Sequence, residues 1–172
     1  EKPYISSSKE FDDKHKLDGK SPRIGIRWQG SPAYDHDLHR SYPLKELYNV
    51  LDKIDGTFYS LQRDNGLDEL KDCPKIIDLS DKLVSFQDTL GIIQNLDFVI
   101  TSCTSIAHLA AASGKRVFVM VPISAYYVWS HSGDQSPWYG DHVTLIRQEK
   151  PRSWKEPIEK LKNILIKEGY LV

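Results

Sequence analysis

The stretch Asp97-Phe-Val-Ile-Thr-Ser-Cys-Thr-Ser-Ile-Ala-His-Leu-Ala-Ala-Ala-Ser-Gly-Lys-Arg-Val-Phe-Val-Met-Val-Pro122 decides the fold of this chain. It begins with a short apolar run, passes through small polar residues into an alanine-rich segment, and stops at Gly114 before a second apolar run. The pattern predicts a buried strand over 97–101, a polar turn, a helix over 105–113 and a buried strand over 116–121. Strand, helix and strand in this order form the basic unit of a parallel α/β sheet.

The polar turn in this stretch is a candidate anion site. Ser102, Cys103, Thr104 and Ser105 bring small polar side chains and backbone N–H groups to a helix N-terminus, and His108 lies one turn further on the same face. The first N–H groups of a helix lack partners within it and the helix dipole is positive there, so the turn predicts a bound phosphate or diphosphate. The alternative is an ordinary Ser/Thr helix cap without a ligand, with His108 as a packing residue.

Length and composition limit the classes of protein. The 172 residues suffice for one domain with a core, and 23 basic against 24 acidic residues give no excess charge to attract nucleic acid. Cys73 and Cys103 form no CxxC or metal-ligand spacing, and two thiols are typical of a reducing compartment. No run approaches the roughly 18 apolar residues of a membrane span. We expect a cytoplasmic protein, with peripheral membrane attachment left open.

The rest of the chain repeats the alternation of strands and helices. Further strands are predicted at 23–28, 57–61, 75–79 and 143–147, and helices at 43–54, 66–72, 86–96 and 154–168. Ser85 with Asp88, and Ser153 with Glu156, resemble capping boxes. We expect a linker or weak helix over 1–20, followed by an α/β domain over 21–172 with a doubly wound, mainly parallel, Rossmann-like sheet.

Right-handed crossovers place the carboxyl ends of all parallel strands at one edge, where open α/β sheets bind ligands. The loop 28–40 reaches this edge and is long for a strand-to-helix connection. It begins at Trp28; Gly30 could admit a phosphate close to the backbone, and Arg40 could pair with a diphosphate. Gln62 ends the second strand, where it would bond a ligand or cap its loop. The alternative for these residues is a solvated loop with a surface arginine.

Two other chemistries are disfavoured. Asp35, His36, Asp37 and His39 include ligand types suited to a divalent metal, but their crowding in sequence is awkward for one ion, and we expect no metal site. Cys103 at a helix N-terminus could be an activated thiolate, but the sequence suggests no acid/base partner other than His108. We therefore interpret Cys103 as a small turn residue.

The loop 122–139 is rich in aromatic side chains, which could stack on a sugar or a base or could close the top of the domain. We interpret Trp138 as part of a structural turn and leave both roles open for Trp129. No GxGxxG follows the first strand and no Walker A sequence occurs, which argues against classical dinucleotide or P-loop binding. A receiver domain would need an acidic cluster at the strand ends that this chain lacks.

Four ordered segments resemble motifs of the heptosyltransferase-like glycosyltransferases of family 9, including the C-terminal domains of tetratricopeptide-repeat glycosyltransferases. The stretch 97–122 is similar to "LDxVIT-x-(D/C)T-xx-AHLAGAxGKPVWVLxP". Residues 23–30 with 40–44 are similar to "IGLxWxGxP…RSIPL", and 57–62 to "xFxSLQ". Residues 136–139 with 145–148 are similar to "SPWY…LFRQ". The resemblance covers about residues 22–165, with Cys103 where many members have Asp.

The resemblance implies the C-terminal half of a GT-B glycosyltransferase, which binds a nucleotide diphosphate-sugar donor and transfers the sugar with inversion, without a metal or other cofactor. The loop 79–85 would hold the nucleobase. The catalytic base and the acceptor, whether saccharide, lipid-linked or protein, would belong to an N-terminal partner domain, so activity of this chain alone is an open question. A non-catalytic ligand-sensing or protein-interaction module is the alternative. The expected substrate-binding residues are Trp28, Gly30, Arg40, Gln62, Ser102, Cys103, Thr104, Ser105 and His108.

Overall fold

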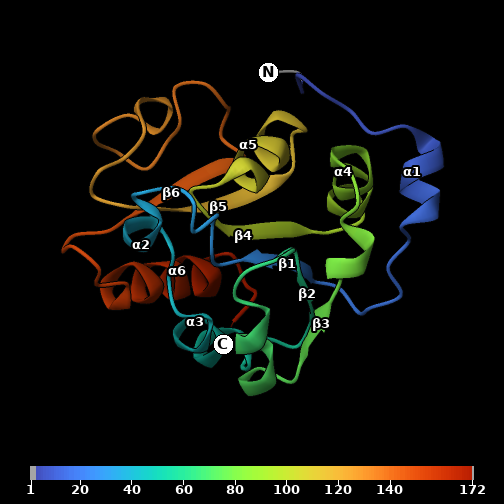
Figure 1. Cartoon of the computed structure of the whole chain (residues 1–172), viewed down its shortest axis with the longest axis horizontal. Coiled ribbons are helices and arrows are strands. Elements are labelled where there is room, and N and C mark those ends of the chain that lie inside the picture. The colour runs from blue at the N-terminus through green and yellow to red at the C-terminus, as the bar shows by residue number, and fades with distance from the viewer. Residues whose placement is uncertain (1–2, 172) are drawn as a thin grey trace.

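A computed structural model describes residues 3–171 and shows one six-stranded, entirely parallel sheet (Figure 1). Its strands are β1 (Arg23–Arg27), β2 (Thr57–Ser60), β3 (Ile76–Asp78), β4 (Phe98–Ser102), β5 (Arg116–Val121) and β6 (Val143–Arg147). Their order, β3-β2-β1-β4-β5-β6, is the doubly wound order of the Rossmann fold. The predicted fold class is confirmed, and the direction of winding reverses between β1 and β4.

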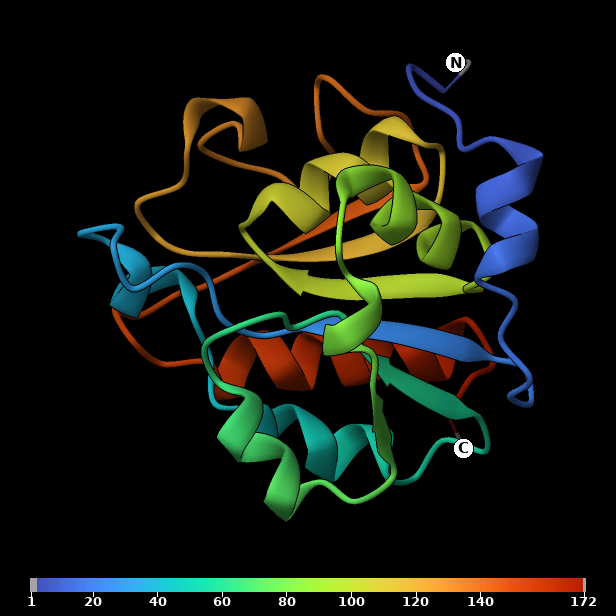
Figure 2. The same cartoon turned by 45° about the vertical axis from the view of Figure 1, so that its right-hand side comes forward.

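Helices cover both faces of this sheet (Figure 2). They are α1 (Lys9–Lys14), α2 (Asp37–Arg40), α3 (Leu44–Leu51), α4 (Phe86–Gln94), α5 (Ser105–Ala112) and α6 (Lys155–Lys167), with 3-10 turns η1 (Leu67–Asp72), η2 (Ser80–Lys82) and η3 (Tyr127–Trp129). The core has two parts: one beneath α3 and α6, the other beneath α4 and α5. No helix within residues 3–171 is long and apolar enough to cross a bilayer.

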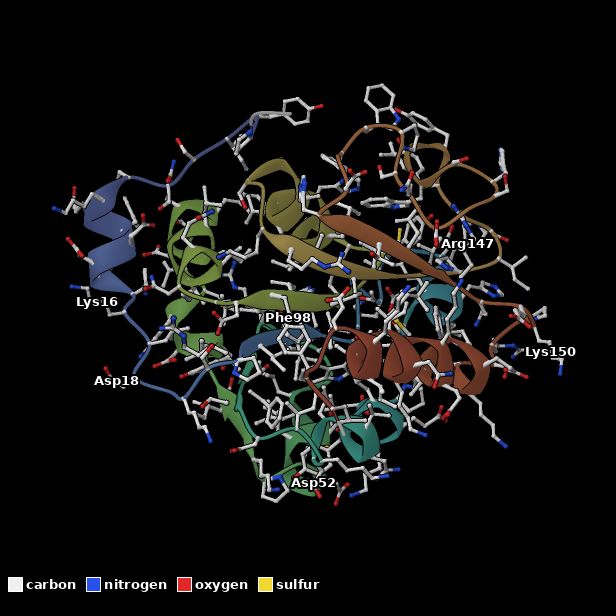
Figure 3. All side chains as sticks on the ribbon, turned by 180° about the vertical axis from the view of Figure 1, so that it is seen from behind. Lys16, Asp18, Asp52, Phe98, Arg147 and Lys150 are labelled. Atoms are coloured by element: carbon white, nitrogen blue, oxygen red, sulfur yellow. The ribbon has the colours of Figure 1, made fainter. Side chains whose placement is uncertain are left out.

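Alternation along the strands divides the side chains between these two layers. Ile24 and Ile26 of β1 pack into the layer of α3 and α6, together with Phe98, which is seen from behind in Figure 3. Gly25 faces the other layer, because a Cβ there would meet Leu96 and Leu61. The same period places Arg27, the last residue of β1, on the α4–α5 side at the carboxyl edge.

The N-terminal segment forms α1, which lies along the outer side of α4 (Figure 1). Asp88 at the start of α4 bonds Lys14 Nζ at 2.7 Å and His15 Nε2 at 2.8 Å. Its own backbone N–H donates to Ser85 Oγ at 3.1 Å, which confirms the predicted helix cap. The segment therefore contacts the α/β unit, while the domain boundary near residue 20 stays a prediction.

Candidate functional site

The start of α5 lies beside the point where the sheet reverses its winding, and no side chain caps it. Thr104 occupies the N-cap position with extended backbone. Its Oγ1 is 3.4 Å from the Ser102 carbonyl oxygen and 3.5 Å from Thr101 Oγ1, so the hydroxyl bonds backward rather than to the first turn. The capping alternative for Thr104 is not what the structure shows, and the first turn keeps N–H groups without a side-chain acceptor.

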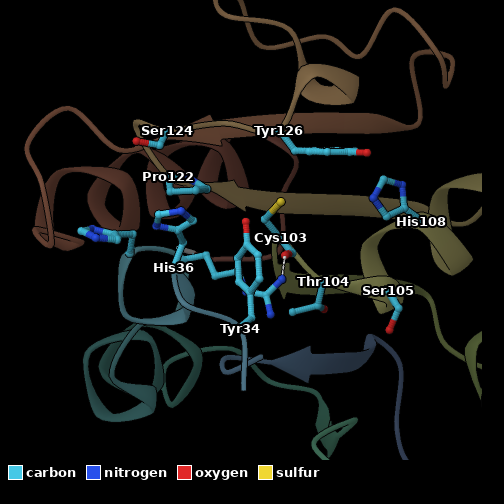
Figure 4. Close-up of a pocket in the computed structure, with 11 residues that line it drawn as sticks. Tyr34, His36, Cys103, Thr104, Ser105, His108, Pro122, Ser124 and Tyr126 are labelled. Atoms are coloured by element: carbon cyan, nitrogen blue, oxygen red, sulfur yellow. Dashed lines mark hydrogen bonds between the residues drawn. The ribbon is translucent and has the colours of Figure 1, made fainter. Parts of the chain in front are cut away.

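Two cavities meet at this turn. The first has a volume of about 560 Å³, the second about 400 Å³, and Ser105 lines both. The first is lined by Tyr34, His36, His39, Arg40, Cys103, Thr104, Ser105, His108, Pro122, Ser124 and Tyr126 (Figure 4). Five of the nine predicted substrate-binding residues therefore share one cavity: Arg40, Cys103, Thr104, Ser105 and His108.

Arg40 ties the long β1–α3 connection to the turn before α5. Its Nε donates to Asp37 Oδ1 at 2.8 Å and its NH1 to the Cys103 carbonyl oxygen at 3.0 Å, the bond drawn dashed in Figure 4. The guanidinium carbon lies 4.4 Å from the centre of the Tyr34 ring. The Arg40 charge is thus already paired within the chain.

Gly30 makes room for this ion pair. A Cβ at Gly30 would collide with Asp37 Oδ1 and with the Arg40 guanidinium. The Gly30 N–H donates to Ser41 Oγ at 3.2 Å, and that hydroxyl donates to Asp37 Oδ2 at 2.9 Å. The close approach that the sequence suggested for Gly30 is therefore to the Asp37–Arg40 pair, and the glycine lies behind the cavity wall.

Trp28, Gln62 and Ser102 also lie behind the cavities, and all three side chains are buried. Trp28 Nε1 donates to Glu69 Oε1 at 3.1 Å, while Gln62 bonds both backbone groups of Gln29 at 3.1 and 3.2 Å. Trp28 and Gln62 thereby support the start of the long loop. The sequence placed them at the correct edge, but it could not show that their side chains turn inward.

Glu69 organises the same loop and was not singled out from the sequence. Its carboxylate accepts hydrogen bonds from Trp28, from Gln29 Nε2 at 2.5 Å and from the Leu44 N–H at 2.8 Å. The last of these bonds supplies an acceptor for a first-turn N–H of α3. Glu69 is about forty residues from Trp28 in sequence, so no local pattern could have revealed it.

His108 closes the far end of the first cavity. Its ring stacks on Trp129, with centroids 4.6 Å apart and planes at 23°, and its Nδ1 is 3.0 Å from the Tyr139 hydroxyl. Burial lowers the pKa of His108, which favours the neutral form of the ring. Trp129, whose role the sequence left open, is fully buried and packs beneath the cavity.

The Cys103 thiol accepts a hydrogen bond from Trp129 Nε1 at 3.0 Å. Burial raises the pKa of this thiol, and the hydrogen bond and the Arg40 charge only partly oppose that rise. A protonated thiol is a poor nucleophile. The geometry agrees with the interpretation of Cys103 as a turn residue.

Arg147, labelled in Figure 3, fastens the aromatic loop 122–139 to the end of β6. Its guanidinium donates to the carbonyl oxygens of Gly133 at 2.6 Å, Ser130 at 3.2 Å and Trp129 at 2.5 Å. The loop leaves Tyr126 exposed at the cavity mouth. Trp138, expected within a structural turn, has an exposed side chain, and its carbonyl oxygen accepts from the Tyr4 hydroxyl at 2.7 Å.

The second cavity is lined by polar and charged side chains as well as apolar ones. Leu83, Val84, Phe86 and Ile106 supply apolar surface, so the predicted loop 79–85 contributes to it. The remaining lining residues are Arg27, Leu61, Arg63, Asp64, Ser85, Thr89 and Ser105. The sequence did not single out Arg27, because nothing local distinguishes it from a surface arginine.

The acidic and histidine residues of the long loop do not gather into a metal site. Asp37 is bound by Arg40 and Ser41, while His36 and His39 are exposed at the cavity mouth. Among residues 3–171 there is no group of three or more side chains placed to hold a metal ion.

No family model and no curated protein matches the sequence. Its structural neighbours are heptosyltransferases. The E. coli heptosyltransferase WaaC with ADP-2-deoxy-2-fluoro heptose superposes with a TM-score of 0.64 at 12% identity, over 92% of this chain and 47% of that chain. WaaC with ADP gives 0.64 at 11% identity, over 98% and 52%. The E. coli ADP-heptose LPS heptosyltransferase II gives 0.61 at 14% identity, over 95% and 54%.

The chain spans about half the length of these enzymes and shares the fold of that half. The structural comparison thus confirms, for the fold, the family resemblance inferred from the four sequence motifs. At these identities it is the backbone architecture that is shared, so substrate and activity must be argued from the cavities themselves.

Proposed function

We propose that this chain is the donor-binding half of a GT-B-type glycosyltransferase and binds a nucleoside diphosphate-sugar. The observation that carries the proposal is the start of α5, which no side chain caps. A cavity lies on each side of it, and Ser105 lines both cavities. A nucleoside diphosphate-sugar has the matching three parts: a base with ribose, a diphosphate and a sugar. The diphosphate would lie over the helix N-terminus, where N–H groups and the helix dipole favour negative charge.

We place the base with its ribose in the second cavity and the sugar in the first. The second cavity offers apolar surface from Leu83, Val84 and Phe86, which suits a flat nucleobase. The first cavity carries hydroxyl, imidazole and aromatic groups, which suit a sugar. The similar WaaC structures contain ADP and an ADP-linked fluoro-heptose, which supports a ligand of this class.

In the proposed reaction an acceptor hydroxyl attacks the anomeric carbon from the side opposite the diphosphate. The bond from that carbon to the diphosphate oxygen breaks, so the configuration inverts and the nucleoside diphosphate leaves. The N–H groups at the start of α5 stabilise the charge that develops on the leaving group, without a metal ion. The base that takes the acceptor proton belongs to the partner domain.

Calorimetry on the 172-residue chain tests the proposal. ADP, GDP and UDP are each compared with their monophosphates, and at least one diphosphate should bind several-fold tighter than its monophosphate, because its second phosphate gains charge-assisted hydrogen bonds at α5. The isolated chain should bind a nucleotide-sugar without transferring its sugar. If no nucleotide binds, a non-catalytic interaction module is favoured; glycosylated product from this chain alone would contradict the assignment of the base to another domain.

A further inference from the structure

Strand β1 begins and ends with an arginine, and the two differ in how their charges are balanced. Both Arg23 and Arg27 are partly buried. Arg23 Nε lies 3.7 Å from Asp97 Oδ2, and the Arg23 backbone N–H donates to the same oxygen at 2.6 Å. Within residues 3–171, Arg27 forms no such pair with a carboxylate. Its NH1 donates to the Leu61 carbonyl oxygen at 2.9 Å, and its Nε, like that of Arg23, is buried without a hydrogen-bond acceptor, so the two arginines differ in their carboxylate partner alone.

The surroundings of Arg27 compensate its charge only in part, because Asp64 and Asp37 favour the charged guanidinium without forming an ion pair with it. Asp64 is the carboxylate with the largest electrostatic effect on Arg27. Its side chain, however, is largely exposed and lies 3.9 Å from Arg63 Nε. Arg40 adds repulsion, and burial is the main cause that lowers the pKa of Arg27. Buried charges in proteins are as a rule paired. A partly buried guanidinium that lines a cavity and has no carboxylate partner among residues 3–171 is therefore suited to bind an anion there.

We propose that Arg27 binds the α-phosphate of the nucleotide, at the inner end of the second cavity. This inference rests on the proposed function and deepens it. With the nucleoside in the second cavity and the sugar in the first, the α-phosphate is the charged group on the nucleoside side of Ser105, where Arg27 lies. The β-phosphate then falls on the side of Thr104 and Arg40.

The two arginines at this edge thereby have different roles. Arg40 is neutralised by Asp37 and bonded to the Cys103 carbonyl, so it chiefly holds the turn in place. Arg27 keeps donors and charge for the ligand. Its position is the one that the motif "IGLxWxG" leaves open, so this contact is a property of this chain and does not follow from the sequence resemblance.

The test measures three ligands with the same base: the nucleoside, its monophosphate and its diphosphate, taken from whichever diphosphate binds the unaltered chain. Arg27→Gln should weaken the monophosphate and the diphosphate by the same factor, roughly 10- to 100-fold, because both carry the α-phosphate. The nucleoside should bind as before. Arg23→Gln changes the charge of the same strand at its opposite end and should leave all three affinities unchanged.

Arg27→Lys guards against a folding defect, since it keeps the charge but loses the planar fork. Its affinities should lie between those of the unaltered chain and Arg27→Gln, with a thermal melt like that of the unaltered chain. If Arg27→Gln lowers the affinity for the uncharged nucleoside by the same factor, the inference is overturned. Arg27 would then contact the base or ribose, or only support the fold. Unchanged phosphate affinities would also overturn it, while nucleotide binding by the unaltered chain keeps the proposed function. If the unaltered chain binds no nucleotide, both proposals fail.

Discussion

The two cavities at the start of α5 differ in how completely their polar groups are satisfied. In the first, Arg40 is paired with Asp37, and His108 bonds Tyr139. In the second, Arg27 carries a partly buried charge with no carboxylate partner among the described residues. Contacts within the chain hold the first cavity in place, whereas in the second the proposed α-phosphate would supply the partner that Arg27 lacks. An arginine that lines a site is therefore not by itself a ligand contact, and its existing partners decide its role.

The same contrast separates stability from binding. Removing one member of a satisfied pair leaves a buried group without its partner and destabilises the fold. Removing an unpaired charge costs the fold little and costs the ligand much. Substitutions that break the Asp37–Arg40 pair should therefore lower the free energy of unfolding, and Arg27 substitutions should chiefly lower affinity.

The largest effect on stability is expected from Asp37→Ala. It leaves Arg40 without its carboxylate and Ser41 without an acceptor. Loss of one partner of a buried pair costs several kcal/mol, and because both side chains keep some exposure we expect about 2–4 kcal/mol. Urea denaturation followed by circular dichroism measures this change.

Two companion variants sharpen that result. Asp64→Ala removes an exposed carboxylate from the second cavity and should change the free energy of unfolding by no more than about 0.5 kcal/mol. The double variant Asp37→Ala/Arg40→Leu should recover part of the loss, because the unpaired charge is gone. Equal stabilities of Asp37→Ala and Asp64→Ala would show that the Asp37–Arg40 pair contributes no more to stability than an exposed carboxylate.

A smaller effect is expected from Thr104→Val, which removes one hydroxyl at the junction of the cavities. The hydroxyl makes only long contacts with the chain, so the thermal melt should stay close to that of the unaltered chain. If the hydroxyl donates to the β-phosphate, diphosphate affinity should fall by about 1.5–3 kcal/mol while monophosphate affinity is kept. A fall in stability with unchanged affinity would make the turn a scaffold only.

The sequence predicted the sheet and its carboxyl edge because those depend on local patterns. Short apolar runs, Gly114 at the end of a helix and Ser85 before Asp88 are all visible within a few residues. The same patterns correctly placed Thr104, Ser105 and His108 together, since one strand and the following helix carry them.

What the sequence could not predict depends on which way side chains turn and on distant partners. Trp28 and Gln62 lie at the correct edge but point beneath the cavities, and Glu69 joins them from another loop. Arg40 and Arg27 have the same chemistry in the sequence, and only the neighbouring Asp37 separates their roles. The short helix α2 and the contact of α1 with α4 likewise depend on tertiary packing rather than on propensity.

A still smaller effect is expected from Cys103→Ala. The substitution removes the acceptor of the Trp129 indole N–H and leaves a small void, so stability should fall by about 1 kcal/mol. Because the pKa of the thiol is raised by burial, the unaltered Cys103 should react slowly with a thiol reagent at pH 7. Thiolate-like labelling there would show that the first cavity is not internally satisfied.

The smallest effect concerns the pH dependence of stability that arises from His108. Burial holds its folded pKa below the usual value of about 6.5, so between the two pKa values the unfolded chain binds more protons than the folded chain. Lowering the pH from about 7.5 to 5.5 should therefore destabilise the protein through this group. His108→Gln should flatten the dependence of the free energy of unfolding on pH in that window. Subtracting the curve of the variant from that of the unaltered chain removes the contribution of the other histidines. Its neighbours Trp129 and Tyr139 carry no charge that would offset a protonated ring.

A bound nucleoside diphosphate would bring negative charge beside His108 and raise the pKa of the ring. The difference between the curves of the unaltered chain and His108→Gln should therefore shrink when the ligand is present. An unchanged difference would show that the phosphates stay on the Arg27 side and do not reach the first cavity.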